Sequence, residues 1–207
     1  KENLAELDKW MIYRSKNLQE EIRQDYENFH FHQAFQKIHN FCANDLGGFY
    51  LDILKDRLYT AKADCYARRS SQTALSNILQ ALLRWISPIL SFTAEEAWLL
   101  LKNDTESVHL LEWFDGWQDF GDLIISNEEW IKVLEIRSEI NKHIEEARHN
   151  GIIGSALDVN LKLYCDKSIK ELLDKFSEEL RFVFITSEAN VFGSEGGNQT
   201  NIEGLRV

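Results

Sequence analysis

The feature that most constrains the fold is a set of apolar stripes with the spacing of an α-helix. In the first hundred residues, apolar side chains recur at steps of three, four or seven, which places them on one side of a helix. The stripes predict a helix ending at about residue 28 and further helices over 35–53 and 75–86. The single proline, Pro88, is expected to end the third helix, because it has no N–H to donate. The pattern therefore predicts an antiparallel helical bundle.

Capping residues refine the boundaries of these helices. Ser70 and Ser71 are expected to cap the third helix, and Thr93-Ala-Glu-Glu96 has the pattern of a capping box that starts another. Residues 102–126 lack the helical period but contain four aromatic residues, so we expect a long connection packed onto the bundle. A second capping box, Ser126-Asn-Glu-Glu129, predicts a helix that stops at Asn150-Gly151.

The period changes to that of a β-strand near the C-terminus. Val159, Leu161 and Leu163 alternate with polar residues, as in a half-buried strand. A short helix over 168–179, strands over 182–185, 189–192 and 202–207, and a flexible loop over 193–201 are expected next. The predicted fold is mainly α, with a helical bundle and its packed connection over 1–126 and a small α+β domain over 127–207.

Charge and cysteine usage narrow the function classes. The net charge is −11, which argues against a phosphate-coated partner unless basic residues cluster. From Gln36 to Arg84 seven bases face four acids, a weak basic island that is able to steer RNA. The three cysteines are widely scattered, so they form neither a disulfide framework nor a zinc knuckle, and they indicate a reducing cytoplasm. No stretch approaches the ~20 apolar residues of a membrane span.

The stretch HNFCANDLGGFYLDILKDRLY, residues 39–59, carries the first candidate binding residues. At about 100° per residue, Asn40, Asn44 and Lys55 fall opposite the apolar stripe, together with Gly48. Glycine costs ~1 kcal/mol in a helix, so it indicates the close approach of another backbone. One interpretation is RNA, with these three side chains as donors to phosphate or ribose. The other is a neighbouring helix, with the charged residues of the stretch forming intramolecular pairs.

Two further groups of side chains are candidates for RNA contact. Arg68 and Arg69 lie before a predicted helix start, where guanidinium groups and the helix dipole favour phosphate, although pairing with acids of the bundle explains them as well. Arg137, Asn141 and Arg148 share one side of a predicted helix and form either a second contact surface or a solvated face.

The remaining polar and aromatic features indicate no chemistry. The sequence shows no Gly-rich phosphate loop, activated nucleophile or acid/base pair, so we assign no catalytic residue. His30 and His32 lack a third ligand at useful spacing, so we assign no metal site. Trp113 and Trp117 are candidates for stacking on an unpaired base. Three other tryptophans are expected to be core anchors: Trp85, Trp98 and Trp130.

Several segments of the chain resemble, in order, the C-terminal anticodon-binding region of bacterial isoleucyl-tRNA synthetases, a class I family. They are LAELDKWMI (4–12), the stretch 39–59 quoted above, ARRSSQTAL (67–75), SPILSFTAEEAW (87–98) and RSEINKHIEEARHNGIIGSAL (137–157). The resemblance implies a helical anticodon-binding bundle followed by a small junction domain. It also implies binding of the anticodon stem and loop of isoleucine tRNA.

The resemblance further implies what the chain does within a longer protein. The parent enzyme would join isoleucine to its tRNA with ATP and Mg, and would bind zinc, whereas this fragment would hold no cofactor. It lacks the catalytic core, its HIGH and KMSKS motifs, the editing domain and the zinc segment. We expect a cytoplasmic monomer whose partners are the tRNA and the catalytic core of the same chain. The alternatives are the equivalent region of a valyl-tRNA synthetase and a helical protein-interaction scaffold with no RNA role.

Overall fold

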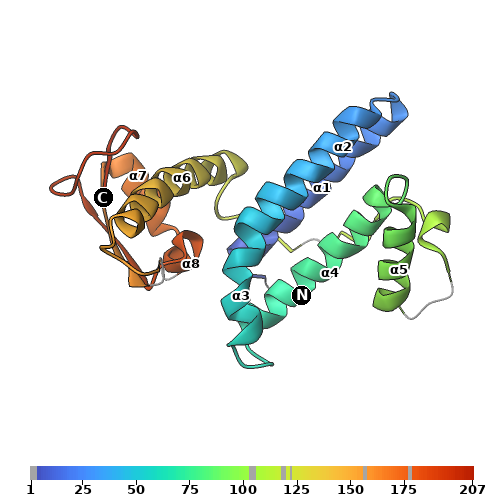
Figure 1. Cartoon of the computed structure of the whole chain (residues 1–207), viewed down its shortest axis with the longest axis horizontal. Coiled ribbons are helices and arrows are strands. Elements are labelled where there is room, and N and C mark those ends of the chain that lie inside the picture. Colours follow the sequence, from blue (N-terminus) through green and yellow to red (C-terminus); the bar gives the residue numbers. More distant parts are fainter. Residues whose placement is uncertain (1–3, 103–105, 118–119, 122, 156–157, 177–178) are drawn as a thin grey trace. The chain divides into compact units, whose positions relative to one another are not determined.

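The chain folds into two compact units, Lys1–Leu123 and Ile124–Val207. The computed structural model describes residues 4–102, 106–117, 120–121, 123–155, 158–176 and 179–207 (Figure 1). Unit 1 is helical, and unit 2 combines helices with a small sheet. This arrangement confirms the predicted fold class, a helical bundle followed by a small α+β part.

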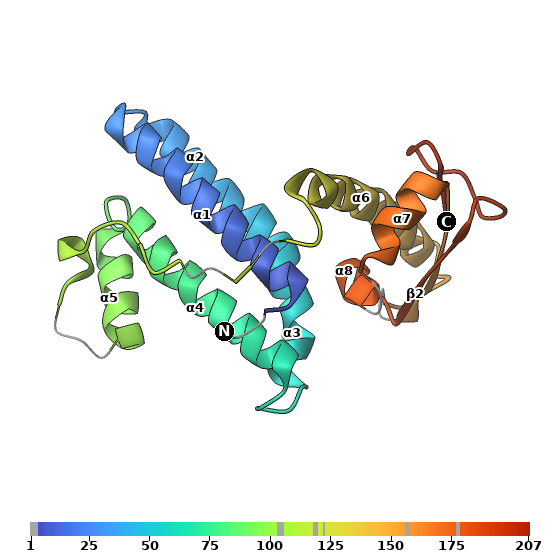
Figure 2. The ribbon, with the colours of Figure 1, turned by 180° about the vertical axis from the view of Figure 1, so that it is seen from behind.

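Unit 1 is organised around α1 (Glu6–Glu27), which packs against both α2 (Phe31–Asn40) and α4 (Tyr66–Ile86) (Figures 1 and 2). The apolar stripe of α1 is confirmed as core, because Leu7, Met11 and Ile22 are fully buried. The second stripe is one uninterrupted helical run, but only its ends are α-helical. Between α2 and α3 (Leu51–Tyr59) the chain forms a π-helix, η1 (Phe41–Tyr50).

The predicted starts of the next two helices are wrong. α4 begins at Tyr66, so Ser70 and Ser71 lie inside it, where their hydroxyls donate hydrogen bonds to a buried carboxylate instead of capping. α5 (Ser91–Lys102) begins before Thr93, because helical bonding already starts where the Ala94 N–H donates to the carbonyl of Leu90. The predicted end of the helix before Pro88 is confirmed, since α4 ends at Ile86.

The connection after α5 contacts the bundle through several of its described residues. It contains a 3₁₀-helix, η2 (Val108–Leu110), whose Val108 joins Trp98 in a small apolar cluster. Phe114 is buried, and its carbonyl accepts a hydrogen bond of 2.8 Å from Gln19 Nε2. The core positions of Trp85 and Trp98 are confirmed by exposures of 0% and 4%.

Unit 2 begins with α6 (Asn127–His149), which opens with the predicted capping box of Ser126 and Glu129. The helix stops at Asn150-Gly151, as predicted, with Gly151 at φ +70°. The sheet has the order β2-β1-β3. Strand β1 (Asn160–Cys165) pairs in parallel with β2 (Glu188–Gly193) and antiparallel with β3 (Leu205–Arg206).

The parallel pair of strands requires a crossover, which α7 (Lys167–Asp174) and α8 (Leu180–Phe184) supply. The predicted strand over 182–185 is therefore wrong. This apolar run ends a short helix, whose last turn closes through hydrogen bonds from the N–H groups of Ile185 and Thr186. Trp130 is a core anchor, as predicted, and meets the ring of Phe176 edge-on at 4.9 Å between centroids.

Candidate nucleic-acid interface

The two glycines of the stretch over 39–59 are explained by their own helix. A Cβ on Gly47 would lie 3.0 Å from the carbonyl oxygen of Cys42, and one on Gly48 would lie 3.3 Å from that of Ala43. Both carbonyls belong to the residue five positions earlier, which is the hydrogen-bond spacing of a π-helix. Among the described residues, no other helix comes within 4 Å of either Cβ position. The glycines therefore accommodate the π-turns, and neither explanation offered by the sequence is needed.

The π-helix also changes the expected alignment of the three candidate donors, Asn40, Asn44 and Lys55. A π-turn holds more residues than an α-turn, so a projection at 100° per residue does not apply across η1. Asn40 and Asn44 are exposed, and Asn40 Oδ1 accepts a hydrogen bond of 3.0 Å from Gln36 Nε2. Lys55 is exposed but donates a hydrogen bond of 2.7 Å to Asp52, which raises the pKa of the lysine. All three side chains are thus exposed to a partner, although the ammonium group of Lys55 is already paired with Asp52.

Arg68 and Arg69 lie in the first turn of α4 but differ in their surroundings. Arg68 is half-buried and donates from Nη1 to the carbonyl of Ala61 at 2.9 Å, so it holds the turn between α3 and α4. Arg69 is exposed, with a long contact of 3.4 Å to Gln72 Oε1. Of the two guanidinium groups, that of Arg69 is the more available to a phosphate.

A buried polar cluster joins four helical segments of unit 1: α1, η1, α3 and α4. The Asp8 carboxylate, fully buried in α1, accepts hydrogen bonds from Tyr50 at the end of η1 and from Ser70 and Ser71 in α4. Arg57 Nη1 lies 3.7 Å from it with 5% of the side chain exposed, so the expected pairing of this arginine is confirmed. Burial raises the pKa of Asp8, against the opposing effect of its hydrogen bonds. Sequence reasoning missed this cluster, although a carboxylate within an apolar stripe was the signal.

The weak basic island is partly neutralised by such pairs. Lys37 Nζ lies 2.7 Å from the buried Asp25 carboxylate, and Lys55 and Arg57 are paired as described. Arg84 is half-buried, with its guanidinium over the rings of Trp98 and Phe114 at 4.9 and 5.4 Å from their centroids. Burial lowers the pKa of Arg84. The island therefore contributes less free positive charge than its composition suggests.

The three candidate binding residues on α6 also differ in their exposure and contacts. Arg137 is half-buried and donates from Nε to the carbonyl of Val183 at 2.9 Å, which ties α6 to α8. Asn141 is half-buried, and the exposed Arg148 lies 3.4 Å from the carboxylate of Glu145. Arg148 is the most open of the three, because the other two side chains are half-buried.

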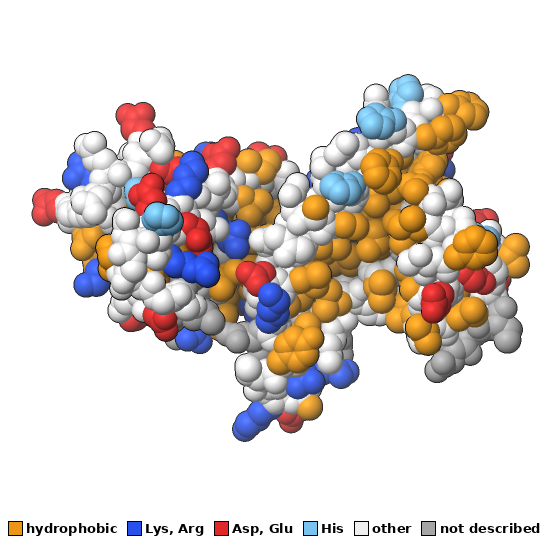
Figure 3. All heavy atoms as spheres, viewed as in Figure 1, with side chains coloured by type: hydrophobic (Ala, Val, Ile, Leu, Met, Phe, Trp, Pro, Cys, Tyr) orange, Lys and Arg blue, Asp and Glu red, His pale blue; other side chains and the backbone are white. Residues whose placement is uncertain are grey.

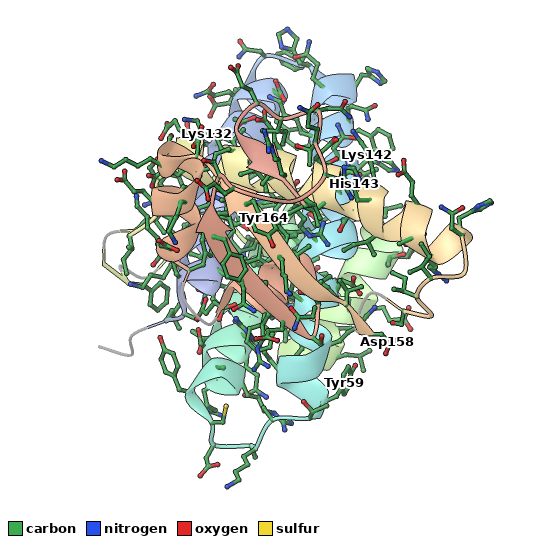
Figure 4. All side chains as sticks on the ribbon, turned by 90° about the vertical axis from the view of Figure 1, so that its left-hand side faces the viewer. Tyr59, Lys132, Lys142, His143, Asp158 and Tyr164 are labelled. Carbon is green, nitrogen blue, oxygen red and sulfur yellow. The ribbon has the colours of Figure 1, made fainter. Side chains whose placement is uncertain are left out.

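Glu139 is a second buried carboxylate that sequence reasoning missed. It accepts hydrogen bonds from Lys142 Nζ and from the N–H and side-chain amide of Asn201, while His143 Nε2 lies 3.8 Å away. Figure 4 shows Lys142 and His143 side by side on α6. The hydrogen bond from Lys142 is the main cause of the lowered pKa of Glu139. This contact fixes one end of the loop over 193–201, which composition alone described as flexible.

The described residues contain neither a set of metal ligands nor a helix able to cross a membrane. There, no group of three or more His, Cys, Asp or Glu side chains is arranged to hold a metal ion. His30 and His32 are both exposed, beside the start of α2. None of the helices described is long and apolar enough to cross a membrane.

Comparison with known proteins shows a family. Residues 8–164, which reach from α1 into β1, match the anticodon-binding domain of tRNA ligase. An isoleucine–tRNA ligase of Legionella pneumophila (strain Corby) is 48% identical over 187 residues, covering 90% of this chain and 20% of that protein. An isoleucine–tRNA ligase of Acinetobacter baylyi is 44% identical over 208 residues, covering 100% and 22%. The chain thus spans about a fifth of the length of these relatives, and it belongs to the anticodon-binding domain family of tRNA ligases.

Proposed function

We propose that this chain recognises the anticodon stem and loop of isoleucine tRNA on behalf of an isoleucine–tRNA ligase. The observation that carries the proposal is the family match over residues 8–164, joined to relatives of that name along nearly the whole chain. In this proposal unit 1 is the anticodon-binding bundle and unit 2 is a junction domain. The longer protein, a cytoplasmic monomer, would join isoleucine to the tRNA with ATP.

The physical role of the fragment is positioning. Binding energy at the anticodon, remote from the reacting groups, holds the tRNA in fixed register so that its acceptor end reaches a catalytic core elsewhere in the longer protein. The Mg and zinc expected in that protein find no set of ligands among the described residues, so no step is assigned to them here.

Exposed apolar side chains of α5 fit a second contact, with the rest of the longer protein. Phe92 and Leu100 are 93% and 78% exposed, which is unusual for large apolar residues of a helix that also carries core positions. The same exposure is what a protein-interaction scaffold without an RNA role would show. Measurement of RNA binding separates the two.

The test is a titration of the chain with isoleucine tRNA and valine tRNA at about 50 and 200 mM salt. We expect salt-sensitive binding that favours isoleucine tRNA. Lys55→Ala and Arg69→Ala should each weaken binding and lower the salt slope by about 1, if each contacts one phosphate. The matched control is Lys167→Ala, whose side chain is 90% exposed on α7 of unit 2.

Each contrary result removes a different part of the proposal. Equal affinities of the variants and the wild-type chain would remove Lys55 and Arg69 from the interface. A preference for valine tRNA would favour the valyl alternative. Absence of binding to either tRNA at the lower salt concentration would leave the scaffold as the better explanation.

A further inference from the structure

The turn between α1 and α2 contains a bulky residue in a position that normally belongs to glycine. Asn28 caps α1, and Phe29 follows at φ +61°. The Phe29 N–H donates to the carbonyl of Tyr26, and the His30 N–H donates to that of Asp25. These two bonds define a Schellman motif, in which the left-handed residue is usually glycine because a Cβ is strained there. A phenylalanine here costs stability without burying its ring, since it is 78% exposed.

The same strain occurs at Ile185, the other non-glycine residue with positive φ among those described. Ile185 is half-buried, so packing accounts for the choice of an apolar side chain at that helix end. Packing does not account for Phe29. Residues with a strained backbone that packing does not explain are concentrated at functional sites.

Phe29 ends a row of four rings that leads from the packed connection to the tip of the α1–α2 hairpin. Trp113 lies 6.1 Å from Tyr26, Tyr26 lies 6.0 Å from Phe31, and Phe31 lies 6.0 Å from Phe29, all measured between ring centroids. We call these residues the aromatic row. Its inner two members are half-buried, whereas Phe31 and Phe29 are 55% and 78% exposed. Figure 3 shows hydrophobic and histidine side chains gathered at this end of unit 1.

Acidic residues are absent from the stretch of chain that carries the two outer rings. The sequence from residue 28 to 44 contains no Asp or Glu, although the chain has 34 acids in 207 residues. At the inner end of the row, Tyr26 and Trp113 line a pocket of about 590 Å³ together with Arg23, Arg84 and His109. Two acids, Glu112 and Asp115, line the same pocket. Beside the tip, the carboxylates of Glu27 and Asp25 in α1 are paired with Arg23 and Lys37.

We propose that the aromatic row is a stacking platform for unpaired bases of an RNA loop, with Phe29 and Phe31 as its open rings. This inference rests on the proposed function, because the anticodon loop is the single-stranded RNA that such a domain would meet. Every base has a π-face, so stacking on exposed aromatic rings binds single strands with little dependence on sequence. Nearby in sequence, the exposed amide of Gln33 can donate to and accept from base edges, whereas Asn28 Nδ2 already donates to the carbonyl of Gln24 at 2.8 Å.

The platform lies apart from the donors that sequence reasoning selected. Asn40 is the last residue of α2 and Asn44 lies in η1, whereas Lys55, Arg68 and Arg69 lie farther along the chain in α3 and α4. The cationic residues would then bind the RNA backbone while the rings bind bases. Affinity and recognition of the loop would thus come from different residues.

The test uses the 207-residue chain and a 17-nucleotide stem-loop carrying the anticodon loop of isoleucine tRNA, with an unstructured heptanucleotide as a second probe. Phe31→Leu keeps an apolar side chain but removes the ring, and Phe29→Gly removes the ring and the strain together. We expect each to weaken binding of the stem-loop by about 5- to 150-fold, the range found when a stacked base loses its ring. Phe31→Trp should retain binding. Phe92→Ala, which removes an even more exposed ring from α5, is the matched control and should leave binding unchanged.

The outcomes separate the platform from the function on which it rests. Wild-type binding that survives both Phe31→Leu and Phe29→Gly would overturn the platform alone. An equal loss with Phe92→Ala, or full binding by Phe31→Leu with loss in Phe31→Ala, would show general apolar adhesion and also overturn it. Failure of the wild-type chain to bind tRNA, stem-loop and heptanucleotide would overturn both proposals. Thermal unfolding of each variant excludes misfolding as the cause of a loss.

Discussion

Replacement of Phe29 by glycine should leave unit 1 more stable than replacement by alanine, the reverse of the usual order in a helix. Alanine keeps the strain of φ +61°, which costs an L-residue about 1–2 kcal/mol in the left-handed region. Glycine removes that strain but loses about 0.5–1 kcal/mol through its larger freedom in the unfolded chain. The difference is therefore up to about 1.5 kcal/mol in favour of glycine. Both variants lose the same ring contacts, which are few because the side chain is 78% exposed.

The assay is urea unfolding of the two variants, followed by circular dichroism at a helical wavelength. The control is a second Ala/Gly pair at Gln33, which is exposed within α2 and has ordinary helical geometry. There alanine should be more stable by about 1 kcal/mol. If alanine were the more stable residue at both positions, the strain assigned to Phe29 would not exist, and the structural argument for the aromatic row would lose its first step.

Three other perturbations test the framework beneath the interface. Asp8→Ala should cost about 3–5 kcal/mol because it leaves a buried guanidinium without its carboxylate, whereas the half-exposed Asp52→Ala should change stability by less than about 1 kcal/mol, both measured by urea unfolding. Gly47→Ala should destabilise the chain more than Gly48→Ala, since its Cβ meets a carbonyl at 3.0 rather than 3.3 Å; equal melting temperatures would contradict this. The lowered pKa of Glu139 means that its contribution to stability is present above the ordinary value of 4.5 and is lost as pH falls through the folded-state pKa. The stability difference between the wild-type chain and Glu139→Gln should therefore shrink on acidification below 4.5, as unfolding curves from pH 7 to 3 would show.

The candidate binding residues show how far local pattern extends. Their exposure could be inferred for Asn40, Asn44 and Lys55, because each falls outside an apolar stripe. Their pairing could not, since the hydrogen bond of Arg137 to Val183 and that of Arg68 to Ala61 depend on which carbonyls the folded chain brings near. No spacing in the sequence encodes those distances.

The aromatic row shows the same division. Tyr26, Phe29 and Phe31 are close in sequence, but the fourth ring, Trp113, comes from a connection more than eighty residues later. In FHFH, residues 29–32, the sequence raised the question of metal binding by the histidines. The structure instead singles out the phenylalanines, through the positive φ of Phe29 and the exposure of both rings.

The sequence by itself determined the helical periods, the strand alternation of β1, the capping box of α6 and the family, because each depends on residues near one another in the chain. The tertiary structure alone decided the π-turns of η1, the role of Ser70 as a partner of Asp8, and the helical state of the run that ends at Phe184. The physical reason is that a buried polar group takes its partners from whichever segments pack around it. Long-range packing then overrides a local signal as weak as a single serine or a short apolar run.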